Sequence, residues 1–371
     1  MRILVHSVPP WATSGYGTQC AHTAAALARL GHQVAISAYA GCHEEREWNG
    51  IPVLPTGGRP YGNGVIAWNY HRWHADLLIL FTDLFVIDPA QMNGLSVMPH
   101  IPVDCDPLGV IDRRWLERVS KIAMLHPVAM SEFGRGQLAA AGYDAPVVPH
   151  ATDFRPRPGL RAQWRKEMNL PGDVLVIGKV AVNNRDDRKA LVPTVHAFAA
   201  FVREHPRSGL YVHTEPQAKD APNLAHMARV LGIGNRVVFA DEDRRAADAY
   251  PASWMEAMYN GIDVLDATSR AEGCGVPIIE ALACGTPVIA SRNSAMTEKI
   301  APAYGWLAGG QPEWPTHHQS AWQTPFIHEM VRCYQKAAAG AAGMRKAAAR
   351  AGQAWSVEAM TAAWKQALDG L

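Results

Sequence analysis

Short apolar segments alternate with longer amphipathic segments along most of the chain. The apolar segments have the length of buried strands, and the amphipathic ones repeat their apolar residues at helical spacing. We expect strands at residues 2–6, 33–38, 77–81, 96–103, 122–130, 174–180, 210–214, 237–239, 262–265 and 286–290. We expect helices at residues 18–30, 160–168, 191–203, 223–231, 254–260, 326–351 and 357–368, and one that begins near Ser131. This alternation predicts an α/β protein with parallel sheets.

The composition narrows the class of protein. The chain has 371 residues, 48% of them hydrophobic, which is enough for two domains with buried cores. Its 35 basic and 34 acidic side chains give a formal net charge of +1, so no basic excess favours stable binding to nucleic acid. Six scattered cysteines without a Cys-x-x-Cys pair are typical of reduced thiols. We find neither a transmembrane segment nor a signal peptide and expect a cytoplasmic protein.

The most informative stretch is residues 269–291, which read S-R-A-E-G-C-G-V-P-I-I-E-A-L-A-C-G-T-P-V-I-A-S. Two glycines bracket Cys274, and Pro277 favours the start of a helix that would carry Glu280 in its first turn. Glu272 lies on the loop between the preceding strand and this helix. Open parallel sheets bind their ligands at such loops, and the N–H groups of a helix start favour an anion there.

Two carboxylates beside an anion site suit a ligand that has both hydroxyls and phosphates. A carboxylate accepts hydrogen bonds from paired hydroxyls, and backbone N–H groups bind phosphate, so a nucleotide sugar satisfies both. The alternative is that Glu280 only interacts with the helix dipole and that Glu272 is a solvated loop residue.

The whole stretch closely resembles the signature of retaining family 4 glycosyltransferases, E-G-x-G-x-P-x-x-E-A-x-A-C-G-x-P-V. The matching positions are Glu272, Gly273, Gly275, Pro277, Glu280, Ala281, Ala283, Cys284, Gly285, Pro287 and Val288. The resemblance implies the GT-B fold, an α/β architecture in which two Rossmann-like, doubly wound domains face each other across a cleft. It also implies transfer of a sugar from a UDP- or GDP-linked donor to an acceptor hydroxyl, with retention of anomeric configuration. The donor would contact Gly273, Cys274, Gly275, Val276 and Glu280, with Cys274 at a place where the family often has an aromatic residue.

In this family, cationic side chains usually hold the donor diphosphate, and we expect no cofactor and no metal. By the resemblance, Lys189 is the diphosphate lysine and Arg188 precedes it. The upstream arginine of the family is replaced by Val182 or Asn183, and Arg185 or Arg188 would substitute for it. The alternative is that this run is an ordinary solvated loop.

The resemblance also assigns roles to other loops. The nucleotide base would meet Phe239 and Asp241. The loop Gly15-Tyr16-Gly17 would lie near the donor phosphates and the acceptor, unless it is only a tight turn. Cys105 stands where relatives commonly place a histidine that touches the donor sugar. Its neighbours make the triplet Asp104-Cys105-Asp106, and we interpret this likeness to a metal-binding Asp-x-Asp pattern as a coincidence.

The expected domains follow from the linker and from the resemblance. Pro156 and Pro158 mark a linker, so we expect an acceptor-side domain at residues 1–155 and a nucleotide-sugar domain at 156–354. The C-terminal helix, about 355–371, would pack back on the first domain. The acceptor is open among natural products, glycans, proteins and modified DNA. A nucleotide-sugar epimerase of the same fold and a non-catalytic nucleotide-sugar or glycan-binding protein are the alternative functions.

Overall fold

The computed structural model describes residues 1–246, 250–315 and 319–371, and these residues fall into two compact units. Unit 1 comprises Met1–Ala151, Trp314–Ser320 and Trp355–Leu371. Unit 2 comprises Thr152–Glu313 and Ala321–Ala354. The first boundary therefore falls slightly before residue 155, and a second segment of unit 1 comes from residues 314–320.

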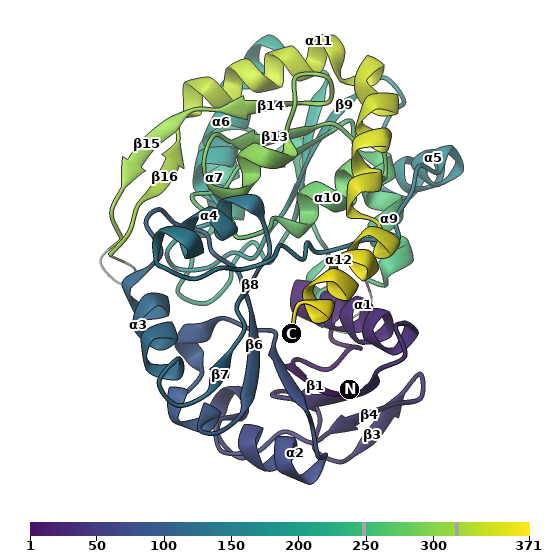
Figure 1. Cartoon of the computed structure of the whole chain (residues 1–371). Helices are drawn as coiled ribbons and strands as arrows, with labels where there is room; N and C mark the ends of the chain where they lie inside the picture. The colour runs from purple at the N-terminus through teal and green to yellow at the C-terminus, as the bar shows by residue number, and fades with distance from the viewer. Residues whose placement is uncertain (247–249, 316–318) are drawn as a thin grey trace. The chain divides into compact units, whose positions relative to one another are not determined.

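Unit 1 is built on a largely parallel sheet with the strand order β3-β4-β2-β1-β5-β6-β7, and β8 pairs with β6 (Figure 1). Its strands are β1 Arg2–Ser7, β2 Gln33–Ala38, β3 Arg46–Trp48, β4 Ile51–Leu54, β5 Leu77–Leu80, β6 Ser96–Ile101, β7 Met124–Leu125 and β8 Val128–Ala129. Its helices are α1 Gly15–Arg29, α2 Ile66–Arg72, α3 Val110–Val119, α4 Glu132–Ala140 and α12 Val357–Asp369. Only the β3–β4 pair is antiparallel among the pairs of this sheet in the described residues.

Two parts of unit 1 differ from the sequence-based expectation. The single strand expected at 122–130 is wrong, because β7 and β8 pair with different parts of β6. Pro127 lies between them, and a proline has no N–H for the ladder, so the pairing is interrupted there. Residues 42–72, for which we predicted no strand or helix, contain the hairpin β3–β4 and helix α2.

The C-terminal helix α12 belongs to unit 1 and lies beside α1 (Figure 1). Its Trp364 is fully buried, and the Trp364 ring lies edge-on to the ring of His100 on β6, with centroids 5.3 Å apart. His100 in turn packs against Phe81 and His150. These rings form a buried aromatic cluster that attaches α12 to the end of the sheet.

Unit 2 is built on a parallel sheet with the strand order β11-β10-β9-β12-β13-β14. Its strands are β9 Leu175–Val180, β10 Ser208–His213, β11 Val237–Phe239, β12 Val264–Ala267, β13 Val288–Ser291 and β14 Gly305–Ala308. Its helices are α5 Pro158–Glu167, α6 Leu191–Glu204, α7 Leu224–Val230, α8 Glu242–Ala246, α9 Ala252–Gly261, α10 Val276–Ala283 and α11 Ile327–Gly352. The antiparallel strands β15 Gly310–Glu313 and β16 Trp322–Pro325, which the sequence did not predict, form a separate ribbon.

The strand order of unit 2 reverses between β9 and β12. The chain proceeds outward from β9 to β10 and β11, and then returns to the other side of β9 with β12. The loops that follow β9 and β12 therefore diverge at this point, which is where doubly wound sheets bind their ligands. Within the described ranges, no helix is long and apolar enough to cross a membrane.

Candidate functional site

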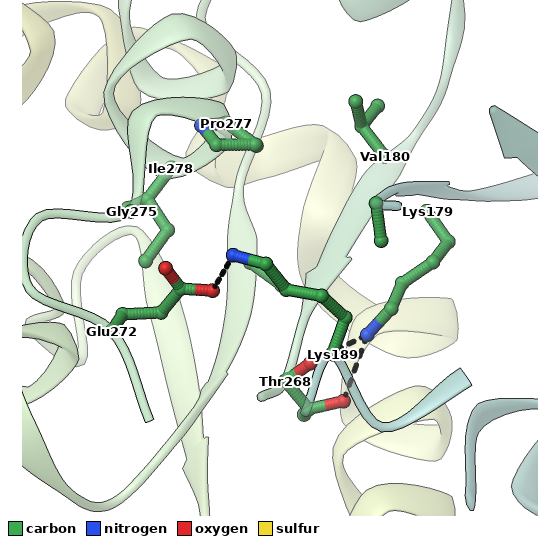
Figure 2. Close-up of a pocket in the computed structure, with 10 residues that line it drawn as sticks. Lys179, Val180, Lys189, Thr268, Glu272, Gly275, Pro277 and Ile278 are labelled. Atoms are coloured by element: carbon green, nitrogen blue, oxygen red, sulfur yellow. Dashed lines mark hydrogen bonds and ion pairs between the residues drawn. The ribbon is translucent and has the colours of Figure 1, made fainter. Parts of the chain in front are cut away.

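A pocket of about 290 Å³ lies at the point where the strand order of unit 2 reverses. One wall comes from the end of β9 and the loop after it, and the other from the end of β12 and the start of α10 (Figure 2). It is lined by Lys179, Val180, Ala181, Lys189, Ala267, Thr268, Glu272, Gly275, Pro277 and Ile278. Two lysines and a carboxylate thus share a small cavity at the carboxyl edge of the sheet.

The turn into α10 depends on Gly275. Its φ of +77° lies in the left-handed region, and an added Cβ would lie 2.9 Å from the side chain of Ile278. Pro277 follows within the first turn of the helix, where its missing N–H costs nothing. Gly273 and Cys274 are buried in the same turn, and Val276 begins the helix.

Lys189 and Glu272, which the cationic loop and the sequence motif supplied as separate candidates, meet in the pocket. The ammonium of Lys189 donates to Glu272 Oε1 at 2.5 Å (Figure 2). Arg188 Nη1 donates to Ala271 O at 2.7 Å and lies 3.8 Å from Glu272 Oε2. Burial alone would raise the pKa of Glu272, but the charges of Lys189 and Arg188 outweigh it and lower that pKa. Glu272 is therefore ionised and held between two cations.

Lys179 is a cation of the pocket that the sequence analysis missed. It lies near the end of β9, and its ammonium donates to Thr268 O at 2.5 Å (Figure 2). The same ammonium lies 3.5 Å from Asp266 Oδ1. Asp266 also accepts hydrogen bonds from Thr194 and Tyr334, at 2.9 Å and 2.5 Å. A lysine inside the apolar run L-V-I-G-K-V was the available signal, since buried lysines need a partner.

Glu280, the second carboxylate of the motif, lies on α10. It is the fifth residue of α10 and so lies in the second turn, not in the first turn as expected. Burial is the main reason that the pKa of Glu280 is raised to about 7. The Tyr259 hydroxyl acts against this rise, and the charge of Asp153 adds to it. Glu280 is not among the residues that line the 290 Å³ pocket.

The remaining candidates of unit 2 are not among the residues that line the pocket. Asn183 is buried and donates its amide to Glu215 O at 3.1 Å and to Pro222 O at 2.9 Å, so it joins two loops. Arg185 is exposed. Phe239 ends β11, and the Asp241 carboxylate accepts the backbone N–H of Arg244 at 2.8 Å. Their contacts with a donor stay predictions.

The residues Gly15, Tyr16 and Gly17 belong to unit 1 and form the first turn of α1, not the loop that we expected. Ser14 caps this helix by accepting the N–H of Gly17, at 3.1 Å, and the hydroxyl of Tyr16 donates to Asp83 Oδ1 at 3.0 Å. A Cβ at position 17 would lie 2.1 Å from the carbonyl oxygen of Ala12, so Gly17 is required by the chain's own packing.

Cys105 also belongs to unit 1, where it is buried. Burial, together with the charge of Asp104, raises the pKa of the Cys105 thiol to about 12, so the thiol is protonated at neutral pH. The hydroxyl of Ser320 donates to Pro107 O beside it. Within the residues that the structure describes, no group of three or more His, Cys, Asp or Glu side chains is arranged to hold a metal ion. Asp104 and Asp106 therefore belong to no such group.

Solved structures with the same arrangement of elements identify the fold. A sucrose-phosphate synthase from Thermosynechococcus elongatus aligns over 100% of this chain and 98% of its own, with a TM-score of 0.77 and 18% identity. The HepE protein of Anabaena, in complex with UDP and glucose, aligns over 100% of both chains, with a TM-score of 0.73 and 18% identity. The chain has the GT-B fold. The fold class expected from the sequence is confirmed, and the pocket lies in the second of the two GT-B units in chain order.

A family model matches within this second GT-B unit. Residues 171–313 match the family model described as "Glycosyl transferases group 1". D-inositol 3-phosphate glycosyltransferase 1 of Catenulispora acidiphila is 26% identical over 220 residues, which are 58% of this chain and 49% of that protein. A GDP-mannose-dependent alpha-(1-6)-phosphatidylinositol monomannoside mannosyltransferase of Mycolicibacterium smegmatis is 29% identical over 185 residues, 46% of this chain and 45% of that protein. The chain thus spans about half the length of these curated relatives.

Proposed function

We propose that this chain is a glycosyltransferase that moves a sugar from a nucleoside diphosphate donor to an acceptor hydroxyl, with retention of anomeric configuration. The observation that carries the proposal is the pocket of unit 2, in which Lys179, Lys189 and Glu272 meet at the carboxyl ends of β9 and β12. Lysine ammonium groups suit the diphosphate, and a carboxylate suits the sugar hydroxyls.

The proposed reaction exchanges one carbon–oxygen bond for another. The bond between the anomeric carbon and the diphosphate oxygen breaks, and its electron pair leaves with the diphosphate. The acceptor oxygen attacks from the face that the diphosphate leaves, and the acceptor proton passes to an oxygen of the leaving phosphate. Lys189 and Lys179 would stabilise the negative charge that develops on the diphosphate, and fixed charges in a site with little water are effective for this.

Each of the two lysines has an anionic partner within the protein, and this suggests how the donor is accommodated. Lys189 is paired with Glu272, and Lys179 with Asp266. A diphosphate that binds Lys189 would replace Glu272 there and leave the Glu272 carboxylate to accept hydrogen bonds from donor hydroxyls. Glu280, once ionised, would accept further donor hydroxyls.

The comparisons support a UDP-linked hexose as the first donor to test. The HepE structures contain UDP, UDP and glucose, or UDP-glucose, whereas the Mycolicibacterium relative is named for GDP-mannose. The family match supports the transferase class, and no finding supports an epimerase. The acceptor is a hydroxyl compound that we propose to bind unit 1, by analogy with the family.

The decisive experiment incubates the purified protein with a panel of nucleotide sugars and measures released nucleoside diphosphate. Slow donor hydrolysis above the background, strongest for one donor, would support the proposal. Binding without any turnover, with or without candidate acceptors, would favour the non-catalytic alternative. Because lysines are proposed to neutralise the diphosphate, turnover should survive EDTA, and restoration by Mn²⁺ after its loss would contradict that part.

A further inference from the structure

A loop later in the chain supports the backbone of Glu272 and of the residues before it. This bracing loop, residues 291–295, begins at the last residue of β13 and runs alongside residues 269–272, which follow β12. The hydroxyl of Ser291 donates to Ser269 O at 2.7 Å and accepts the N–H of Ser269 at 3.1 Å. Asn293 then donates its side-chain amide to Arg270 O at 2.6 Å. Polar side chains thus continue the connection between the two strands beyond their last backbone pair.

Ser294 makes the contact nearest to the functional carboxylate. Its buried hydroxyl accepts the backbone N–H of Glu272 at 3.1 Å, and the N–H of Ala295 donates to Glu272 O at 3.3 Å. Both backbone groups of Glu272 are therefore bound by the bracing loop. The Glu272 side chain points the other way, into the pocket toward Lys189 (Figure 2).

Ser294 makes this contact from an unfavourable backbone conformation. Its φ is +46°, in the left-handed region where a serine is strained and a glycine is not. Such strain persists only where neighbouring contacts hold the residue in place. A glycine would satisfy the backbone at position 294 better, but it has no hydroxyl for the N–H of Glu272.

We propose that Ser294 is a positioning residue for Glu272, whose hydroxyl fixes the backbone of the loop so that the carboxylate meets Lys189 and the donor. This inference rests on the proposed function for the role of Glu272 in donor binding. The contact itself does not depend on the proposed function, because Ser294 and Glu272 are bonded within the protein.

The strain at Ser294 allows a test that separates positioning from stability. Ser294→Gly removes the hydroxyl and relieves the strained φ, so it should keep or raise the melting temperature. Asn169→Gly is the matched control, since Asn169 has a φ of +52°, is exposed and lies outside the site. Ser294→Asn should partly restore function, because asparagine tolerates this conformation and its side-chain oxygen can accept the N–H of Glu272.

Calorimetry with UDP-glucose and with UDP gives the functional readout. For Ser294→Gly we expect UDP-glucose to bind at least about tenfold more weakly, because the displaced Glu272 carboxylate would lose its hydrogen bond with a sugar hydroxyl. UDP has no sugar at this place, so its binding should change little. Asn169→Gly should match the wild type for both ligands. Unchanged UDP-glucose affinity in Ser294→Gly, or an equal loss for both ligands accompanied by a lower melting temperature, would overturn the inference.

Hydrogen exchange tests the contact without any ligand. The peptide that contains Glu272 should exchange faster in Ser294→Gly than in the wild type, and Asn169→Gly should leave it unchanged. Unchanged exchange at Glu272 would overturn the inference. Wild-type protein that binds none of the nucleotide sugars would instead overturn the proposed function, and exchange would still decide whether Ser294 fixes the loop.

Discussion

Glu280 combines a partly buried position with a proposed role that requires its charge. Burial raises the pKa of its carboxyl from 4.5 to about 7, so at neutral pH the protonated and ionised forms are both populated. The ionised form accepts hydrogen bonds from hydroxyls better than the acid does. We therefore predict that UDP-glucose affinity increases as the pH rises through about 7, measured by calorimetry between pH 6 and pH 8. Glu280→Gln should bind more weakly and lose this pH dependence.

Stability should respond to the same residue with the opposite sign. The folded protein holds the proton of Glu280 more tightly than the unfolded chain, so ionisation disfavours the folded state. The contribution of Glu280 to the free energy of unfolding is therefore greatest below pH 4.5 and decreases as the pH rises through about 7. Urea titrations of wild type and Glu280→Gln should diverge across this range. Parallel pH profiles of the two proteins would contradict the raised pKa.

Asp266 and Lys179 form a buried ion pair whose contribution to the free energy of unfolding can be measured without any substrate. Asp266 is 0% exposed and Lys179 is 1% exposed. Removal of one partner leaves an uncompensated buried charge, so Asp266→Asn should lower the free energy of unfolding by about 3–5 kcal/mol. The double variant Asp266→Asn, Lys179→Met should recover part of that loss. Urea denaturation of the wild type, the single variants Asp266→Asn and Lys179→Met, and the double variant gives the coupling energy, and strictly additive losses would show that the two charges are independent.

The start of helix α1 shows how one element constrains its own sequence. At Gly17 an added Cβ would lie 2.1 Å from the carbonyl oxygen of Ala12, whereas at Gly15 no atom lies within 4 Å of it. We predict that Gly17→Ala costs about 1–3 kcal/mol through overpacking and that Gly15→Ala is nearly neutral. Thermal melts of the two variants test this. Equal melting temperatures would mean that the turn before α1 adapts to the added methyl group. Because a substitution at Gly17 disturbs this packing, it is not a suitable test of donor binding.

Several elements of unit 2 could be predicted because their sequence pattern is local. The apolar run of β9 and the glycine-rich entry to α10 predicted a strand, a loop and a helix that the structure contains. The partners of Lys179 and Glu272 could not be found in this way. Asp266, Tyr334 and the bracing loop come from distant segments, and they meet only because β12 lies between β9 and β13. In unit 1, Pro127 was a visible signal for the interrupted strand.

At the scale of the whole molecule, α12 comes from the C-terminal part of the chain but belongs to unit 1, which is built mainly from residues 1–151. Trp364 is 0% exposed, whereas Trp314 is 61% exposed. Trp364→Ala should lower the free energy of unfolding by about 3–5 kcal/mol, as for other buried tryptophans, and Trp314→Ala should change it little. Chemical denaturation followed by circular dichroism measures both. Similar losses in the two variants would mean that the aromatic cluster does not hold α12.

The place of α12 in the chain also affects synthesis in the cell. Residues 1–151 leave the ribosome before unit 2, yet the helix that packs against His100 comes from residues 357–369, after the whole of unit 2. Domains generally fold as they are synthesised, starting from the N-terminus, and unit 1 cannot complete its fold in that order. Its apolar face beside α1 must wait for the rest of the chain. A nascent chain that stalls before residue 357 would therefore present this face to chaperones.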